Sequence, residues 1–338
     1  MMEVSTPETA KPAAPQDDVL LEVKGLKVHI DLPGGRVAKA VDGVDFTIRR
    51  GESVGLVGES GSGKTMTCLS VMRLYAVPTA HVIAGEIWFD GEDLLKKPIA
   101  EMEHYRGNRI AMIPQDPLTS LNPVLSIGNQ VAEAMTTHYP ASREAARART
   151  LEALEAVRVP GAAHRLAQYP HQFSGGTRQR IVAAMGMINK PQLMIADEPT
   201  TALDVIMQAQ FLKLLRDIQA ESGMSMLWVT HDLGVVAQTC DHVNVMYAGR
   251  IVESGDVRRI FKRPSHPYTI ALMQSVPTTS DKRERLYQIK GQPANVFDLP
   301  PGCPFYDRCP IHMDKCRTAY PDKTPVGKDG FVHCWARQ

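Results

Sequence analysis

Gly58-Glu59-Ser60-Gly61-Ser62-Gly63-Lys64-Thr65 has the pattern G-x-x-x-x-G-K-T and decides the fold of this 338-residue chain. The apolar run 53–57 before it predicts a short strand, and a helix-compatible segment begins at Lys64. Glycines let the backbone curl so that its N–H groups point at phosphate oxygens, and a helix N-terminus adds positive potential. The stretch therefore predicts a nucleoside triphosphate site, held by Gly58, Ser60, Gly61, Ser62, Gly63, Lys64 and Thr65.

Two of these residues have separate tasks in this pattern. The lysine, here Lys64, reaches the β- and γ-phosphates, and the hydroxyl of Thr65 binds Mg²⁺. Further along, the apolar run 193–196 ends in Asp197 and Glu198. Such a run suits a buried parallel strand, whose carboxyl end lies beside the phosphate loop. We expect Asp197 to complete the Mg²⁺ shell and Glu198 to polarise the attacking water as general base.

Between these motifs lies the stretch Phe173-Ser174-Gly175-Gly176-Thr177-Arg178-Gln179-Arg180. It resembles the signature of ATP-binding cassette (ABC) proteins. Gln115 stands where the family's glutamine loop is expected. Ala202-Leu203-Asp204 resembles the family's D-loop, and His231 resembles its switch histidine. Each of these residues alone has an ordinary explanation, such as a surface glutamine or a structural histidine. Their joint order and spacing make the resemblance specific.

The resemblance implies a nucleotide buried between two cassettes. Ser174, Gly175 and Gly176 would contact ATP held by the phosphate loop of a different cassette. Because this chain has one phosphate loop and one signature, it requires a second cassette from another chain. The family picture gives His231 a contact with the γ-phosphate and Asp204 a role in communication across the dimer. Gln115 would sense Mg²⁺, so the expected catalytic set is Glu198, His231 and Gln115.

Four further stretches narrow the subfamily, because they resemble the oligopeptide/dipeptide importer ATPases: 115–123, 169–173, 266–269 and 302–309. The resemblance covers about residues 20–338. It implies an ATP-hydrolysing subunit that energises di/oligopeptide uptake, peripheral on the cytoplasmic face of the inner membrane. The implied partners are a second, different ATPase chain, two permeases and an extracytoplasmic solute-binding protein. Import of nickel, an opine or a sugar by the same architecture is the alternative.

Two positions depart from the family pattern. Thr177 stands at the end of the signature, where Gln, Glu or Met is more usual. The family's adenine-stacking aromatic should fall near Ile30, which is not aromatic. Stacking on the base would there be replaced by apolar contact.

The expected fold class is α/β, an ABC-type P-loop ATPase cassette with a RecA-like core, an antiparallel β region and a helical subdomain. Apolar alternation predicts strands within 20–48 around the turn 33–35, and Asp90-Gly91 predicts a hairpin. Residues 124–158 are helical in character, with Ser142 as N-cap. Apolar runs predict a parallel strand at 226–229 and a hairpin over 243–253.

The predicted organisation has three parts. Residues 1–19 form a flexible tail, 20–262 the nucleotide-binding domain with its helical subdomain at about 101–180, and 263–338 a small Cys-rich C-terminal extension. The extension is marked by frequent proline and by fading helical periodicity.

Cys303, Cys309, Cys316 and Cys334 lie in this extension, with five, six and seventeen residues between them. Four thiolates suit tetrahedral Zn²⁺ or an iron–sulfur cluster. The absence of a C-x-x-C pair argues against a zinc ribbon. Members of the resembled family carry a four-iron four-sulfur cluster in this region. We therefore expect a 4Fe-4S site, with Zn²⁺ and unligated thiols as alternatives. His312 and His333 are nearby spare ligands, although ordinary surface histidines are the preferred interpretation of both.

Composition excludes several classes of protein. With 38 Lys+Arg against 37 Asp+Glu, the net charge of +1 gives no support for nucleic acid as a partner. No apolar run approaches the roughly 18 residues of a membrane span. A soluble ABC ATPase acting on ribosomes or DNA usually carries two cassettes or long coiled coils, and neither is evident here. Glu198 and His231 argue against a regulator without turnover.

Overall fold

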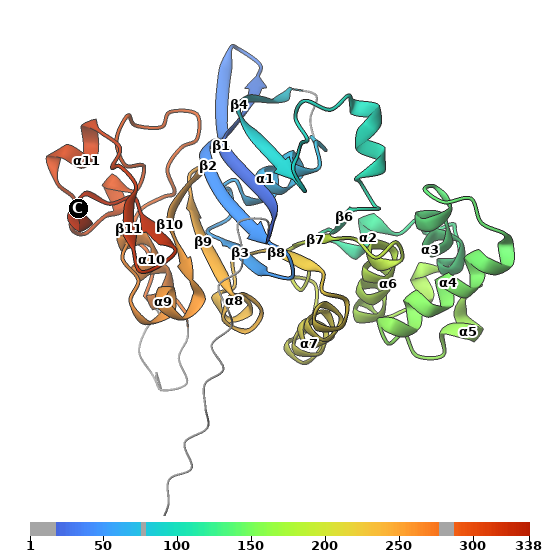
Figure 1. Cartoon of the computed structure of the whole chain (residues 1–338). Helices are drawn as coiled ribbons and strands as arrows, with labels where there is room; N and C mark the ends of the chain where they lie inside the picture. Colours follow the sequence, from blue (N-terminus) through green and yellow to red (C-terminus); the bar gives the residue numbers. More distant parts are fainter. Residues whose placement is uncertain (1–17, 76–78, 277–286) are drawn as a thin grey trace, which may run out of the picture.

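The computed structural model describes residues 18–75, 79–276 and 287–338. The chain folds around two β-sheets, with helices packed between and beside them (Figure 1). Residues 1–17 of the predicted tail lie outside the described ranges. Val19, the last residue of that predicted tail, already begins the first strand.

The smaller sheet is antiparallel and has the strand order β2-β1-β4-β5. Its strands are β1 (Val19–Leu32), β2 (Arg36–Arg49), β4 (Ala80–Phe89) and β5 (Glu92–Asp93). Val23, Leu26 and Val28 of β1 are buried, as the apolar alternation predicts. The predicted turns at 33–35 and at Asp90-Gly91 connect β1 to β2 and β4 to β5, so both hairpins are confirmed.

The larger sheet has the order β11-β12-β10-β9-β3-β8-β7-β6. Five neighbouring strands are parallel: β9 (His242–Tyr247), β3 (Ser53–Val57), β8 (Ser225–Thr230), β7 (Leu193–Asp197) and β6 (Ile110–Ile113). β10 (Arg250–Asp256), β12 (Gly330–Val332) and β11 (Thr324–Val326) continue the sheet in antiparallel fashion. The predicted parallel strands and the 243–253 hairpin are confirmed. Because β6, β7, β8 and β3 are parallel, their carboxyl ends share one edge.

The helices fall into groups along the chain. α1 (Lys64–Val71) follows β3, and the short 3-10 helix η2 (Ile99–His104) precedes β6. A helical region follows with α2 (Pro117–Ser120), α3 (Ile127–Thr136), α4 (Arg143–Ala156), α5 (Ala162–Arg165), η3 (Pro170–Gln172) and α6 (Gly175–Met187). α7 (Val205–Ser222), α8 (Leu233–Thr239) and α9 (Val257–Lys262) complete the cassette. The extension contains α10 (Pro267–Gln274), η4 (Tyr306–Arg308), α11 (Asp314–Thr318) and η5 (Trp335–Arg337).

The helical region agrees with the sequence in one respect and differs in another. Ser142 caps α4 as predicted, because its hydroxyl accepts the Ala145 N–H at 3.2 Å. The predicted range 101–180, however, includes β6, which pairs with β7 inside the central sheet. A short apolar run is buried equally well in a strand or a helix, so its periodicity could not separate the two.

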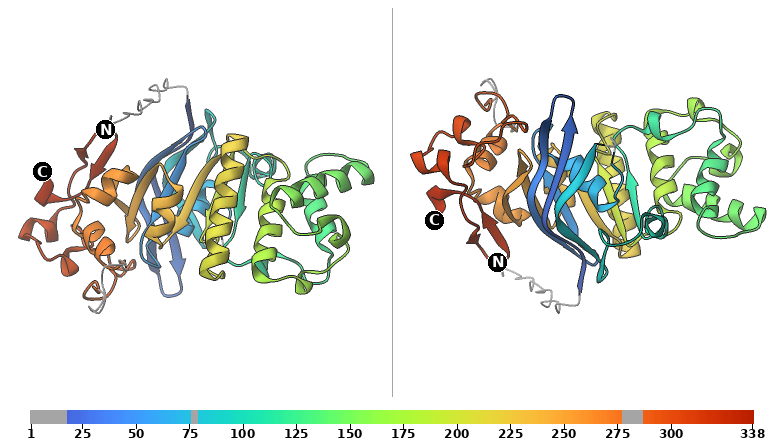
Figure 2. Two further views of the ribbon diagram at one scale, coloured as in Figure 1. Left: turned by 90° about the horizontal axis from the view of Figure 1, so that it is seen from below. Right: turned by 90° about the horizontal axis from the view of Figure 1, so that it is seen from above.

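The helical region and the C-terminal extension lie at opposite ends of the molecule (Figures 1 and 2). The extension is joined to the cassette by backbone pairing, since β12 pairs with β10 at Glu253 and Ser254. Two apolar clusters fill the interior, and fully buried Trp228 of β8 belongs to the larger one. The central sheet therefore continues into the extension.

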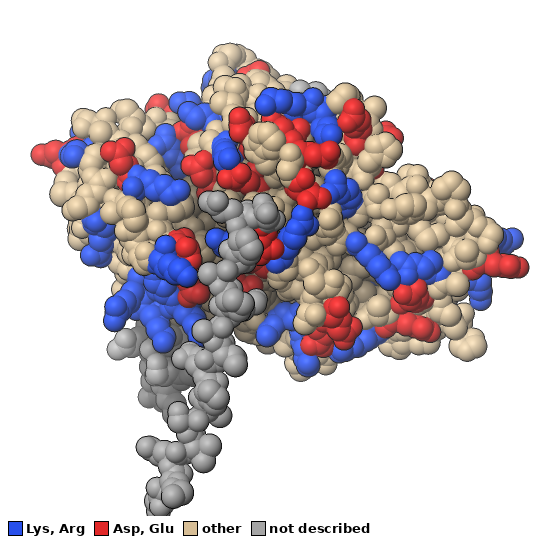
Figure 3. All heavy atoms as spheres, in the orientation of Figure 1, with Lys and Arg blue, Asp and Glu red and all other residues tan. Residues whose placement is uncertain are grey.

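On the face shown in Figure 3, acidic and basic side chains are interspersed over most of the surface. Within the described ranges, no helix combines the length and apolar character needed to cross a membrane.

Candidate functional site

The phosphate loop connects β3 to α1 through close backbone contacts. Gly63 has φ 103°, and a Cβ there would lie 2.3 Å from the carbonyl oxygen of Ala40. A Cβ on Gly58 would lie 2.1 Å from the carbonyl oxygen of Met246. Both positions therefore require glycine, one for its backbone conformation as well as for space. The loop can curl only because these side chains are missing.

Lys64 begins α1 and reaches back along the loop. Its Nζ donates to the carbonyl oxygens of Gly58 at 2.8 Å and Glu59 at 3.0 Å. Burial lowers the pKa of Lys64, and the carboxylates of Glu198 and Asp197 oppose that shift. The ammonium thus lies inside the curl of the loop, where a triphosphate is expected.

Thr65 and Asp197 place two oxygen donors side by side. The Thr65 hydroxyl donates to Asp197 Oδ1 at 3.3 Å. Asp197 ends β7 with only 3% of its surface exposed, and burial raises the pKa of its carboxyl group. A hydroxyl and a carboxylate are ligands that Mg²⁺ takes in nucleotide sites, so this donor pair fits the ion.

Glu198 is held by three side chains. Gln115 Nε2 donates to its Oε2 at 3.1 Å, and the Thr201 hydroxyl donates to the same oxygen at 3.2 Å. His231 Nδ1 lies 3.2 Å from Oε1. Glu198 itself has φ 45°, a conformation that residues with a side chain rarely adopt. The fold therefore holds the carboxylate in one direction at a cost of about 1–3 kcal/mol.

These groups meet because of the order of the strands. Gln115 follows β6, Asp197 ends β7, Glu198 follows β7, and His231 follows β8. The three strands are neighbours in one parallel sheet, so their carboxyl ends converge beside the phosphate loop. The structure thus brings together the three residues expected to be catalytic.

A cavity of about 970 Å³ contains this arrangement. Gly58, Lys64, Thr65, Gln115 and Glu198 line it, and so do Thr201 and His231. The remaining wall is mostly apolar and is formed by Ile30, Leu32, Ala38, Ala40, Met66, Leu69, Leu272, Val296 and Phe297. Val296 and Phe297 belong to the C-terminal extension and escaped the sequence analysis, because no local pattern links them to the phosphate loop.

The signature segment lies elsewhere. Ser174 caps α6, since its hydroxyl accepts the Thr177 N–H at 3.4 Å, and the two hydroxyl oxygens are 3.0 Å apart. A Cβ on Gly175 would meet no atom within 4 Å. Asp204 is exposed and caps α7 by accepting the N–H groups of Ile206 and Met207. Among the described residues that line the nucleotide cavity, none comes from 174–176, and Asp204 is absent too.

The extension contacts the phosphate loop directly through Arg308. Its guanidinium donates to both carboxylate oxygens of Glu59, at 2.7 and 3.0 Å, and only 4% of the side chain is exposed. These bonds hold the pKa of Arg308 above its usual value. The Glu59 N–H donates to the hydroxyl of Tyr268 at 2.8 Å. Glu59 is one of the variable positions of the loop pattern, so sequence alone offered no signal for this contact.

Cys303, Cys309, Cys316 and Cys334 line one small cavity of about 20 Å³. A Cβ on Gly302 would lie 2.1 Å from the Cys316 carbonyl oxygen, so glycine allows the cysteine segments to approach. Burial raises the pKa of Cys303 to about 12 and also raises the pKa of Cys309 and Cys334. Throughout the described ranges, no three His, Cys, Asp or Glu side chains are grouped as ligands of one metal ion.

The two spare histidines lie outside that cavity. His312 Nδ1 is 2.8 Å from the carbonyl oxygen of Cys309, and His333 Nδ1 is 2.9 Å from that of Pro321. The histidine that does line the cavity is His266, which the sequence analysis did not consider as a ligand. Its Nδ1 accepts the Tyr268 N–H at 3.0 Å.

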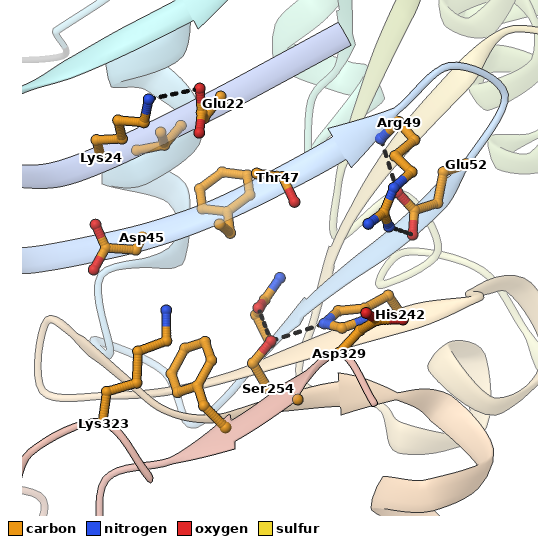
Figure 4. A pocket seen from close by; sticks show the side chains of 15 residues that line it. Glu22, Lys24, Asp45, Thr47, Arg49, Glu52, His242, Ser254, Lys323 and Asp329 are labelled. Atoms are coloured by element: carbon orange, nitrogen blue, oxygen red, sulfur yellow. Dashed lines mark hydrogen bonds and ion pairs between the residues drawn. The ribbon is translucent and has the colours of Figure 1, made fainter. Parts of the chain in front are cut away.

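Figure 4 shows a second cavity, of about 550 Å³, between β1–β2 and the β11–β12 hairpin. Several of its polar groups pair with each other: Lys24 with Glu22 at 2.8 Å, and His242 Nε2 with the Ser254 hydroxyl at 2.8 Å. None of the residues expected from the motifs lines it. The chemistry of the chain is therefore concentrated at the phosphate loop.

Comparisons with known proteins agree with this geometry. Residues 41–201 match the family model described as ABC transporter, and residues 252–316 match that of the oligopeptide/dipeptide transporter C-terminal region. A dipeptide transport ATP-binding protein of Bacillus subtilis is 48% identical, covering 94% of each chain. An oligopeptide transport ATP-binding protein of Escherichia coli is 44% identical, covering 95% of this chain and 94% of its own.

Solved structures resemble the cassette part. A dimeric ATP-binding cassette, MJ0796, in a post-hydrolysis state bound to ADP and Pi, has a TM-score of 0.63 at 26% identity and covers 71% of this chain and 99% of its own. A cbiO1 subunit from Clostridium perfringens has a TM-score of 0.61 at 26% identity, covering 73% of this chain and 92% of its own. With full-length relatives at this level of identity, the chain belongs to the family of ATP-binding subunits of oligopeptide/dipeptide ABC transporters.

Proposed function

We propose that the chain hydrolyses ATP between its own phosphate loop and the signature segment of a second, non-identical cassette. The chain is an ABC transporter ATPase that energises di/oligopeptide import. The observation that carries the proposed site is the convergence of Gln115, Glu198 and His231 beside Lys64 and Thr65. This one cavity holds groups for binding phosphate, holding Mg²⁺ and activating water.

Each group has a task that follows from its position. The loop N–H groups and Lys64 bind the phosphates, and Thr65 with Asp197 would hold Mg²⁺. When bound, the ion neutralises charge that develops on the phosphate oxygens. Glu198 takes the proton of the attacking water, and Gln115 and His231 keep its carboxylate aimed. His231 is more than half exposed, so it can also reach a γ-phosphate.

The position of the signature supports a second cassette. Ser174–Gly176 lies outside the cavity, Gly175 faces open space, and the neighbouring α7 begins with Val205 and Ile206 at 81% and 71% exposure. Apolar side chains with that exposure are typical of surfaces that another protein covers. The dimer of the MJ0796 cassette with ADP and Pi supports the same arrangement. Loss of the γ-phosphate would remove the group that bridges the two cassettes.

The proposed assembly completes the importer. This chain pairs with a different ATPase chain beneath two permeases, which receive solute from an extracytoplasmic binding protein. It lies at the cytoplasmic face of the inner membrane. Full-length similarity to dipeptide and oligopeptide transport ATPases favours peptides over nickel, opines or sugars as the solute.

Reconstitution tests this proposal. The chain is co-purified with its permeases, placed in liposomes with the binding protein, and assayed for ATP turnover with single solutes. Di- and oligopeptides are expected to raise turnover, whereas nickel, an opine or a sugar is not. Stimulation by one of those other solutes alone would overturn the peptide assignment, and turnover by the isolated monomer at the full rate would overturn the shared site.

The four cysteines support a second proposed feature, an iron–sulfur cluster that staples the extension. Four thiols converge on one cavity whose other walls are largely apolar. A single Zn²⁺ would need its sulfurs about 2.3 Å from one point. Thiolates around a cluster stand farther apart, since iron and sulfide ions lie between them. When bound, the cluster would crosslink Cys303, Cys309, Cys316 and Cys334.

Metal analysis of anaerobically purified protein tests the cluster. We expect iron and acid-labile sulfide with a brown absorption spectrum, lost in Cys309→Ser together with the thermal stability of the extension. Cys240→Ala is the matched control, because Cys240 is buried but far in sequence from the four cysteines. Zinc instead of iron would overturn the cluster in favour of a zinc site, and absence of both would leave unligated thiols.

A further inference from the structure

The nucleotide cavity has an apolar wall, defined here as Ile30, Leu32, Ala38, Leu272 and Phe297. The first three come from the β1–β2 hairpin and Leu272 from α10. Phe297 comes from a loop of the C-terminal extension, more than two hundred residues after the phosphate loop. It contributes the only aromatic ring among the described residues that line this cavity, apart from the imidazole of His231.

The loop that carries Phe297 is anchored by hydrogen bonds at the residues just before the ring. The Lys39 N–H of β2 donates to the Val296 carbonyl oxygen at 3.0 Å, which joins the loop to the edge of the small sheet. The Ala294 N–H donates to the hydroxyl of Tyr247 at 3.0 Å. The Phe297 N–H donates to Asn295 Oδ1 at 3.0 Å. The backbone is thus fixed while the ring remains exposed.

Exposure of this ring has a chemical consequence. Phe297 keeps 45% of its surface accessible although its loop is tied down, and the guanidinium of Arg36 lies 5.7 Å from its centroid. A fixed, accessible aromatic ring loses little conformational entropy when a flat ligand stacks on it. Aromatic rings pair with nucleobases through their faces, and the other side chains of the wall are aliphatic. The apolar wall therefore fits a flat, largely apolar ring attached to the triphosphate.

We propose that Phe297 stacks on the purine base of ATP, so that the C-terminal extension supplies the base contact of the nucleotide site. Ile30 occupies the place on β1 where an aromatic is expected by resemblance, and it supplies only aliphatic contact. The inference rests on the proposed placement of the phosphates at Lys64 and Thr65. It makes Phe297 a binding residue whose contribution is to affinity for the base of the nucleotide.

The test compares ATP with inorganic tripolyphosphate, which has the phosphates without the base. In the full-length chain, Phe297→Ala is expected to raise the dissociation constant for ATP about 5- to 20-fold, as loss of one base–aromatic stack does. Affinity for tripolyphosphate, which has no base to stack, is expected to stay within twofold. Phe297→Trp is expected to restore ATP affinity and to show indole fluorescence quenching with ATP but not with tripolyphosphate.

Met313→Ala is the matched control, because Met313 is an exposed apolar side chain of the same extension at 41% exposure. It is expected to change neither affinity. Equal weakening of ATP and tripolyphosphate by Phe297→Ala, or no weakening of either, would overturn the stacking role. Failure of the phosphate placement has a different result: Lys64→Ala would then leave tripolyphosphate binding unchanged, whereas we expect it to abolish binding of both probes.

Discussion

The two sides of the nucleotide cavity are built in opposite ways. The phosphate side consists of groups at the carboxyl ends of β3, β6, β7 and β8, each within or next to a recognisable motif. The apolar wall consists of ordinary aliphatic residues and one phenylalanine from a distant loop. Charged chemistry needs particular residue types at particular spacings, whereas apolar contact needs only shape and area. The phosphate side can therefore be predicted from sequence motifs, whereas the apolar wall cannot.

The C-terminal extension is joined to the cassette and to the nucleotide cavity by contacts between segments far apart in the chain. Its backbone pairs with the central sheet, its Arg308 binds Glu59 in the phosphate loop, and its Phe297 lines the nucleotide cavity. Arg308, which binds the phosphate loop, is adjacent in sequence to Cys309, which lines the cysteine cavity.

The largest effect is expected on the phosphate side, at Glu198. Glu198→Gln keeps a hydrogen-bond acceptor for Gln115 Nε2 and Thr201 but cannot accept a proton from water. Turnover is expected to fall about 10²- to 10⁴-fold while ATP still binds. Steady-state hydrolysis and nucleotide titration measure the two quantities. Glu221→Gln, at the exposed end of α7, is the control, and turnover within threefold of wild type in Glu198→Gln would remove Glu198 from the role of base.

An intermediate effect is expected where the extension meets the loop. Arg308→Gln removes two charge-assisted hydrogen bonds to Glu59. A hydrogen bond to a charged group contributes about 1.5–3 kcal/mol. ATP affinity is expected to fall about 3- to 10-fold, because the loop is less firmly held. A double-mutant cycle with Glu59→Gln should give a coupling energy of about 1 kcal/mol or more. Arg337→Gln, which removes an exposed contact of the extension, serves as control, and an equal effect there would contradict the link.

The effect on the nucleotide site is expected to be smallest at His242, because His242 lies in the other cavity and its titration acts on stability. Burial lowers the pKa of His242 to about 4, with Arg49 and Arg259 favouring the neutral ring and Asp256 and Asp329 opposing them. Its ordinary pKa is about 6.5, so the unfolded chain binds the extra proton first as pH falls. Stability is therefore expected to decline by about 1–3 kcal/mol between pH 6.5 and 4.

Thermal unfolding at pH 7 and pH 4.5 measures this decline. In His242→Gln the drop in melting temperature over that interval should be a few degrees smaller than in wild type. His81→Gln, at an exposed histidine of β4, is expected to follow wild type. If both variants show the same pH dependence as wild type, His242 has no part in the acid lability of the fold.

Much of the fold could be predicted from local pattern. The loop 58–65, the hairpin turn at 90–91 and the Ser142 cap depend on residues adjacent in sequence, so their chemistry is visible there. The buried runs at 193–196 and 226–229 predicted parallel strands for the same reason. The structure adds β6, a four-residue strand for which the sequence offered no separate prediction.

The sequence alone predicted which chemistry this protein carries: a phosphate loop, a threonine and an aspartate for Mg²⁺, a general base and four clustered cysteines. Only the tertiary structure decided which of these groups meet. Strand order placed Gln115, Glu198 and His231 within hydrogen-bonding distance, and sheet extension by β12 joined the C-terminal residues to the cassette. The physical reason is range: a motif acts through neighbouring residues, whereas Phe297 and Arg308 reach the site through contacts between segments far apart in the chain.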